Sequence, residues 1–358
     1  MAFNSRIDYH IPIDEKWETN AGTQYYFRNS KDNYYVDNNF ESLFKYSDKI
    51  VSAYGSVKYS TSHDLSFQTG IRFENVFTTI NDSVKNTNFN FMPTLSVGYK
   101  INEKNLLRLN ISRKSVYPAY RDLSSHTIYS IDSMNITKGN PYLKPLNELS
   151  FGVEYKYMGN IAFMSFSPSY SLINNTISTK YTVMSDGIIE ADNFNLSKTH
   201  RIGGMFELDF DVFYFESGIY YDFFPNREHN GFSITADMGA KIDLPFDFYI
   251  DMNITLKDLE RKYNYVYEAK PSLDYFLIGR TFFKGTIEMG IMFMGFLPKI
   301  EKDHSTTMQK NYKNEWYGRV EQKEIMFRFR YSLQRGKKLQ NRNIDLYMES
   351  GEPLVPRR

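Results

Sequence analysis

Apolar and polar side chains alternate one for one over long stretches of this 358-residue chain. Around residue 150, for example, Leu149, Phe151 and Val153 alternate with Ser150 and Glu154. Successive side chains of a β-strand point to opposite faces of its sheet, so this pattern predicts long strands with one apolar face. The same alternation recurs in the segments 65–74, 107–112, 206–212, 248–256 and 325–333.

The length of these runs separates a membrane sheet from a soluble one. A tilted strand needs roughly 9–11 residues to cross a bilayer, whereas strands of soluble sheets more often stop near about 5–6 residues. The longer runs, such as residues 149–157 and 325–333, approach the first value. The chain also contains 29 Tyr and 29 Phe, and aromatic side chains gather at the two interfaces of a membrane barrel.

Hydropathy and charge agree with this prediction. Mean hydropathy is −0.51 and no apolar run is long enough for a membrane helix, but alternating strands cancel in such averages. The net charge of +1 gives no reason to expect nucleic acid as a partner. Cysteine is absent, which excludes disulfides and cysteine-ligated metal sites. Met1 is not followed by a charged and then apolar leader, so we expect any leader to have been removed or to lie upstream.

Short and long connections alternate along the chain, as they do in outer-membrane barrels with tight periplasmic turns and longer outer loops. Long polar stretches are expected as outer loops at residues 29–41, 79–90, 118–145, 175–195, 224–231, 260–268 and 298–322. Tight turns are expected at Ile13–Lys16, Thr61–Asp64, Asn102–Asn105, Gly159–Asn160, Asp211–Phe213, Leu244–Asp247 and Phe283–Gly285.

This layout predicts an all-β fold: an antiparallel transmembrane β-barrel with about 15 strands present. The first strand, near Ser5–Ile11, and the last, near Lys323–Gln334, both run inward. An odd count with an outer start is expected of part of a larger barrel, such as one of about 22 strands. We therefore predict a transmembrane portion over residues 1–334 and a periplasmic tail over residues 335–358.

One region resembles a known family. It contains Asn90–Lys100, which includes Pro93, and Leu109–Leu123, which reads L-N-I-S-R-K-S-V-Y-P-A-Y-R-D-L. The heptad Gly139–Pro145 (G-N-P-Y-L-K-P) follows. These motifs resemble the outer-membrane β-barrel family of Bacteroidetes, a branch of the TonB-dependent receptors. The residues that carry the likeness are Pro93, Arg113, Pro118, Tyr120, Leu123, Gly139, Asn140, Pro141, Leu143 and Pro145.

The resemblance implies the barrel of an outer-membrane transporter in a Gram-negative bacterium. Such a receptor imports a siderophore, vitamin or oligosaccharide with energy from a TonB-type partner, and it carries an N-terminal plug that this sequence lacks. Outer-membrane lipid and a surface lipoprotein are further expected partners. The heptad is expected to be structural, with Gly139 adopting unusual backbone angles and the prolines holding the chain extended before Leu146.

The outer loop at 118–145 is the best place for ligand contact. Its candidate residues are Tyr117, Tyr120, Arg121, His126 and Tyr129, although a solvated lid is an equal alternative. Charged residues on the polar faces are expected to line the lumen: Glu154, Glu207, Asp209, Asp211, Asp251, Arg328 and Arg330. The six histidines lack metal-ligand spacing and no catalytic motif occurs, so we expect no cofactor, no metal and no enzyme.

Two other functions are compatible with the sequence. A passive porin-like channel would require the barrel to close on these strands alone. A soluble secreted β-protein, either an adhesin or a glycan-active enzyme, would require a dry core. The charged residues on the polar strand faces argue against such a core.

Overall fold

Long antiparallel strands make up most of the chain. The computed structural model describes residues 1–36, 39–61, 64–130, 134–269, 271–283, 285–295, 303–318 and 323–332. Within them the strands are β1 (Ala2–Pro12), β2 (Trp17–Val36), β3 (Asn39–Ser60), β4 (Leu65–Ile80), β5 (Val84–Asn102), β6 (Asn105–Val116), β7 (Thr127–Tyr129), β8 (Asn135–Lys138), β9 (Leu146–Met158), β10 (Ala162–Asn174), β11 (Ile177–Val183), β12 (Ile189–Asn195), β13 (Lys198–Phe210), β14 (Phe213–Phe223), β15 (Gly231–Leu244), β16 (Phe248–Lys262), β17 (Tyr265–Ala269), β18 (Ser272–Phe282), β19 (Ile287–Met294), β20 (Asp303–Gln309), β21 (Tyr312–Gly318) and β22 (Glu324–Tyr331).

Helical structure is brief. It consists of α1 (Tyr120–Leu123) and the 3-10 turns η1 (Arg227–His229) and η2 (Pro245–Asp247). No helix among the described residues is long and apolar enough to cross a membrane.

One sheet of 18 strands dominates the molecule, and a small sheet holds β7, β8, β11 and β12. Within the described residues, fifteen strands of the large sheet pair in antiparallel succession, which agrees with the strand number expected from the sequence. They are β1 to β6, β9, β10, β13 to β16, β18, β19 and β22. The remaining three, β17, β20 and β21, extend the sheet beyond β16 at one end.

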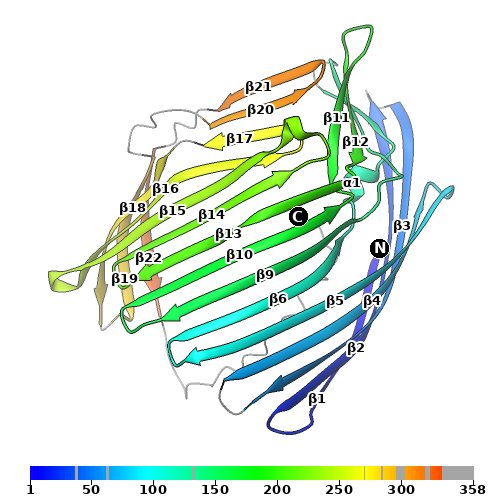
Figure 1. The fold of residues 1–358 in the computed structure, drawn as a ribbon. Coiled ribbons are helices and arrows are strands. Elements are labelled where there is room, and N and C mark those ends of the chain that lie inside the picture. Colours follow the sequence, from blue (N-terminus) through cyan, green and yellow to red (C-terminus); the bar gives the residue numbers. More distant parts are fainter. Residues whose placement is uncertain are drawn as a thin grey trace.

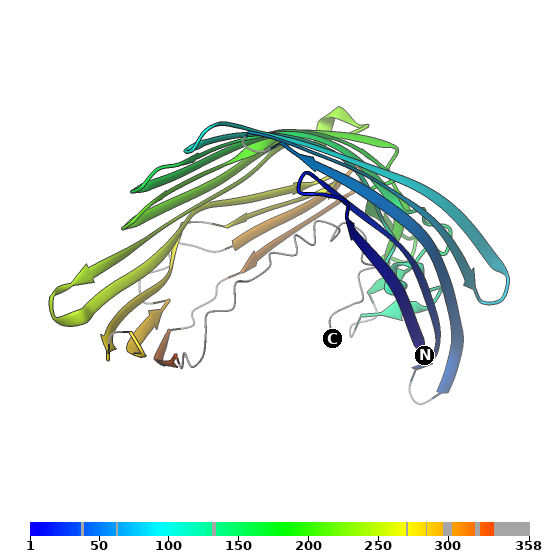
Figure 2. The same ribbon diagram turned by 90° about the horizontal axis from the view of Figure 1, so that it is seen from below.

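The large sheet curves into an open arch rather than a closed cylinder (Figures 1 and 2). Among the described residues, β1 pairs only with β2 and β22 pairs only with β19. The strands at the two edges therefore keep one row of backbone groups each without a partner strand in this part of the chain.

All seven predicted tight turns connect neighbouring strands where they were expected, although part of two of them lies outside the described residues. Several predicted loops are wrong in extent. Residues 29–36, 79–80, 84–90 and 260–262 continue β2, β4, β5 and β16, and residues 175–195 and 303–318 form the hairpins β11–β12 and β20–β21. A hairpin that rises into water satisfies its own backbone hydrogen bonds and needs no apolar face, so hydrophobic alternation does not mark it.

The two faces of the large sheet differ in chemistry. On one face, called the outer face here, cross-strand pairs join apolar residues: Phe73 with Phe91, Ile111 with Phe151, and Ile278 with Ile291. Many of these side chains are exposed, as with Ile71 at 44% and Phe151 at 40%. Large exposed apolar surfaces of this kind mark faces that contact a membrane or another protein.

The opposite, inner face carries charged and polar pairs. Arg72 donates to Glu74 at 2.9 Å, Arg201 to Asp222 at 2.7 Å, and Arg28 to Asp48 at 3.1 Å. In these three pairs the partner lies on the same face, two residues along the strand or on the adjacent strand. The alternation seen in the sequence therefore separates an apolar surface from a polar one across a single sheet.

Because the two faces meet different media, a charge should cost more on one than on the other. Leu109→Arg on the outer face of β6 is expected to lower the free energy of unfolding by about 2–4 kcal/mol in a bilayer. Asn110→Arg, on the inner face one residue along, should cost much less. Urea unfolding of the complete protein in lipid vesicles measures both values, and equal costs would contradict the assignment of the faces.

The segment from residue 333 to the end, which includes the predicted tail at 335–358, lies outside the described residues. The last strand ends at Tyr331.

Candidate functional site

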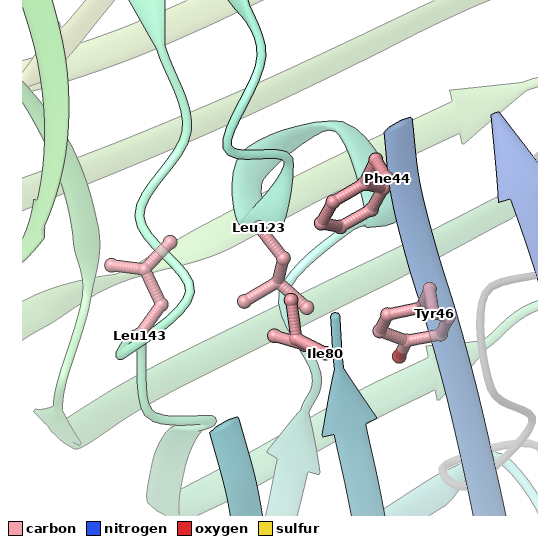
Figure 3. Close-up of a cluster of buried hydrophobic side chains, with 5 residues drawn as sticks. All are labelled: Phe44, Tyr46, Ile80, Leu123 and Leu143. Atoms are coloured by element: carbon pink, nitrogen blue, oxygen red, sulfur yellow. The ribbon is translucent and has the colours of Figure 1, made fainter. Parts of the chain in front are cut away.

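The segment from Tyr117 to Pro145 folds back onto the inner face near the start of β3 and the end of β4. Leu123 and Leu143 from this segment pack with Phe44, Tyr46 and Ile80 in a buried cluster (Figure 3). All five side chains are at most 5% exposed. The segment is therefore part of a packed structure over much of its length.

Tyr117 attaches the start of this segment to the wall of the sheet. Its hydroxyl donates to Glu74 on β4 and accepts from Asn90 Nδ2 on β5 at 2.7 Å. Glu74 is 3% exposed and is also bound by Arg72. A buried carboxylate needs such partners, so the phenol contributes to keeping Glu74 satisfied.

Tyr120 and His126 are packed as well. Tyr120 forms edge contacts with Phe44 and Tyr46, with ring centroids 5.0 and 5.5 Å apart. Burial raises the pKa of the Tyr120 phenol, and the nearby Asp32 carboxylate adds to the rise. His126 is 5% exposed; its Nδ1 lies 2.5 Å from Ser42 Oγ and its Nε2 lies 3.9 Å from Asp32 Oδ2.

Only two of the five ligand candidates have exposed side chains, Arg121 on α1 and Tyr129 on β7. Tyr129 is 48% exposed. The remaining three contribute packing or hydrogen bonds to the inner face, and sequence alone gave no means of separating them from the exposed pair.

A cavity of about 90 Å³ remains between this segment and the wall. Arg28 and Asp48 line it and are joined by two hydrogen bonds of 3.1 Å, while the guanidinium lies 4.9 Å from the centre of the Tyr46 ring. Pro118 also lines the cavity. The charged groups that line the cavity are already paired with each other, so the cavity is better suited to a structural role than to ligand binding.

The heptad at 139–145 connects the segment to its neighbours. The Gly139 and Asn140 amides donate to the carbonyls of Ser124 and Asp122 at 2.9 and 2.6 Å. Asn140 Nδ2 donates to the Asn193 carbonyl of β12 at 2.9 Å, and β9 begins at Leu146.

The reason for a glycine at position 139 differs from the one expected. Positive φ angles at described glycines occur at positions 187, 285 and 295, so Gly139 needs no unusual backbone angle. A Cβ at Gly139 would instead lie 2.4 Å from the Ser124 carbonyl oxygen and 2.6 Å from that of Asp122. Close approach of two backbone segments leaves no room for a side chain.

Other residues of the motif lie in strands. Pro93 stands opposite Ile71 in the pairing of β5 with β4, and Arg113 stands opposite Leu149 in that of β6 with β9. Pro141 accepts a hydrogen bond at its carbonyl from Asn86 Nδ2 at 3.2 Å.

The charged residues expected in the lumen fall into several groups. Glu154 on β9 lies 3.6 Å from Arg108 and 2.8 Å from Lys156. Arg330 lies 3.8 Å from Glu288, and Arg328 stands opposite Gly290. Asp211 lies in the short turn between β13 and β14.

Carboxylates predominate on β13 to β18. Glu207 stands opposite Glu216, and Glu216 opposite Asp237. Asp209 lies near the same end of β13, and Asp251 accepts from the Tyr275 hydroxyl at 3.0 Å. Glu207, Asp209, Glu216, Asp237 and Asp251 form no ion pair within the described part of the chain. The chain thus has a polar, acidic wall on one side of the arch.

A link between outer hairpins was not foreseen. Gln309 at the end of β20 accepts from the Tyr181 amide at 2.9 Å and donates to the Thr179 carbonyl at 2.8 Å, both on β11. Its side-chain amide thus pairs with the edge of β11 as a neighbouring strand would. The Tyr181 and Tyr312 rings stack at 4.7 Å. No local signal in the sequence marks contacts between residues so far apart.

Clusters of three or more metal-ligating side chains do not occur among the described residues.

The arched antiparallel sheet, with its apolar outer face and polar inner face, defines a transmembrane β-barrel of the outer-membrane type. The sequence profile of the outer membrane protein beta-barrel family matches residues 2–331, and the chain belongs to that family. It is therefore a protein of the outer membrane of a Gram-negative bacterium.

Solved structures share the fold at low sequence identity. The FrpB iron transporter from Neisseria meningitidis is 10% identical with a TM-score of 0.56, over 82% of this chain and 50% of FrpB. The siderophore receptor PirA from Acinetobacter baumannii is 14% identical with a TM-score of 0.57, over 83% and 50%. The copper transporter OprC is 10% identical with a TM-score of 0.61, over 82% and 50%.

The chain therefore spans about half the length of these structures. A search of curated proteins finds no match.

The Tyr117 hydroxyl should hold the segment from Tyr117 to Pro145 against the inner face. Tyr117→Phe keeps the ring but removes one partner of buried Glu74, which is expected to lower the free energy of unfolding by about 1–3 kcal/mol. Amide hydrogen exchange should rise over residues 117–145. Tyr142→Phe, at a ring that is 69% exposed, is the matched control and should change neither quantity. Unchanged exchange in Tyr117→Phe would contradict the attachment.

Proposed function

We propose that this chain is the barrel portion of a TonB-dependent receptor that imports a nutrient across the outer membrane. The observation that carries the proposal is the shared barrel fold of FrpB, PirA and OprC, an iron transporter, a siderophore receptor and a copper transporter. The sequence motifs around Pro93 and Gly139 support the same class.

The open arch supports a barrel completed by further strands. The fifteen successive strands of the described residues leave β1 and β22 with one partner each. Exposed strand edges are not tolerated in the hydrocarbon region, so each edge requires a partner in the membrane. Seven further strands would give the roughly 22 strands of plugged transporters.

In this proposal the inner face lines the lumen. Glu154, Glu207, Asp209, Asp211, Asp251, Arg328 and Arg330 would meet water or a plug domain there. The plug would receive energy from a TonB-type partner, and a surface lipoprotein could deliver the cargo. A siderophore, a vitamin or an oligosaccharide is the proposed cargo class, and Bacteroidetes are the proposed source.

Arg121 and Tyr129 are the proposed ligand contacts, because their side chains are exposed on the segment that folds onto the inner face. A guanidinium suits a carboxylate or phosphate, and a phenol ring suits an apolar or sugar ring.

Energised import has a direct test. Cells carrying the complete gene and cells lacking it are given a labelled ferric siderophore, cobalamin or a labelled oligosaccharide. We expect one of these to accumulate only when the gene is present, and a protonophore or loss of TonB should abolish the accumulation. Uptake that continues under both treatments would instead establish a passive channel.

The ligand contacts are tested in the same cells. Arg121→Gln and Tyr129→Ala should each reduce binding of the imported compound by about tenfold, which corresponds to roughly 1.4 kcal/mol. Tyr142→Ala, exposed elsewhere on the same segment, is the control. If both variants bind the compound as tightly as the wild type, this segment is not part of the ligand site.

A further inference from the structure

The outer face of β1 to β5 contains a hollow of about 480 Å³. Its floor consists of small side chains, with Thr23 on β2 directly opposite Ala53 on β3. Large side chains stand around it: Ile7, Tyr25, Val51, Phe73 and Phe89. Their exposure, from 40% for Phe73 to 67% for Ile7, shows that the hollow opens away from the inner face.

The walls are formed by ordered aromatic contacts. The Phe73 ring lies 6.2 Å from Phe89, in a stacked arrangement, and 5.3 Å from Phe91. On the other side, Tyr25 lies 6.3 Å from Phe3. Because this face meets the hydrocarbon of the membrane, the hollow presents a mainly apolar recess to lipid chains, with Ser5 and Asn75 as polar residues of its lining.

A lysine stands directly above the recess. Lys49 lies on β3 four residues from Ala53 and on the same face, between Phe27 and Phe77 in the neighbouring strands. Its ammonium lies 5.9 Å from the centre of the Phe27 ring. The direction from Ala53 to Lys49 leads away from the short turns and toward the long hairpins, hence toward the outer leaflet.

Three more lysines continue this basic edge. Lys31 and Lys45 stand directly opposite each other on β2 and β3, and Lys85 lies on β5 opposite Thr79. Lys45 is paired with Asp82 at 2.6 Å. Lys31, Lys49 and Lys85 form no ion pair within the described ranges. Like charges held opposite each other on a sheet are destabilising, and Asp82 offsets this repulsion only at Lys45.

We propose that the recess and its lysine edge bind a phosphate-bearing lipid of the outer leaflet. An acyl chain occupies the hollow over Thr23 and Ala53, and the phosphate lies at Lys49 with Lys31, Lys45 and Lys85 around it. Each lysine near a membrane surface attracts an anionic lipid by about 1 kcal/mol. An alternative is that these lysines only extend their ammonium groups into the headgroup region. This would explain the charge, but it does not explain the recess below Lys49.

This proposal concerns lipid recognition by the outer face and does not depend on transport or on any cargo. A site of this kind would keep one anionic lipid next to the barrel at the strands nearest β1. The other possible occupants of a lipid-facing hollow, a second copy of the chain or another membrane protein, are distinguished by the experiment.

The test uses the complete protein, purified in mild detergent and freed of lipid. Phosphatidic acid and phosphatidylcholine with the same acyl chains are added separately, and native mass spectrometry counts the lipids retained. We expect the wild-type protein to retain one phosphatidic acid at concentrations where it retains no phosphatidylcholine. Lys49→Gln should weaken retention of phosphatidic acid about fivefold.

Two variants separate charge from shape. Lys104→Gln removes the same charge in an exposed short turn at the other membrane surface and should retain lipid as the wild type does. Ala53→Leu fills the floor of the hollow without changing charge and should weaken retention of phosphatidic acid. Heat-modifiable gel migration confirms that each variant is folded.

Five results would overturn the proposal. Two are unchanged retention in Lys49→Gln and unchanged retention in Ala53→Leu. The other three are an equal loss in Lys104→Gln, equal retention of both lipids, and displacement of the lipid by inorganic phosphate alone. A wild-type dimer that Ala53→Leu converts to a monomer would identify a second copy of the chain as the occupant and would also reject the lipid site.

Discussion

The structure depends on one constraint: a single sheet must meet two different media. In hydrocarbon every backbone N–H and C=O needs an internal partner, and antiparallel pairing supplies these partners for strands that have a neighbour on both sides. Side chains at successive positions of a strand then point to opposite faces of the sheet. Residues such as Phe73, Phe91 and Ile111 meet the apolar medium, while Arg72 and Glu74 lie on the opposite face of the same stretch of sheet and form an ion pair with each other.

The polar face is shaped by the segment between β6 and β9. Tyr117 joins Glu74 and Asn90, and Leu123 and Leu143 close a cluster with Phe44. Part of an outer loop thus joins the inner wall, while other side chains of the loop, among them Arg121 and Tyr129, remain exposed. The outer hairpins are joined in a similar way, since Gln309 pairs with the edge of β11. This segment and the outer hairpins are therefore held by contacts with defined partners.

Much of the sheet could be predicted from the sequence because a membrane strand must alternate. The alternation of Leu149, Phe151 and Val153 with polar residues predicts β9, and the turns at Ile13–Lys16 and Asn102–Asn105 follow from their residue types. The outer hairpins were not predicted as strands, since paired residues such as Thr179 and Asn193 are both polar and give no hydrophobic alternation. The packing of Tyr120 and His126 could not be predicted because it depends on Phe44 and Ser42, far away in the sequence. Gly139 was recognised as special, but its cause is crowding by Ser124 and Asp122 rather than backbone angle.

Contact between the outer face of the sheet and lipid hydrocarbon can be measured directly. The chain has no native cysteine, so single cysteines can be placed at each position from Leu149 to Tyr157 in the complete protein and labelled with a fluorophore. In vesicles of brominated lipid, we predict strong quenching at positions 149, 151, 153, 155 and 157 and weak quenching at the positions between them. Uniformly weak quenching, or quenching without this period of two, would contradict the account.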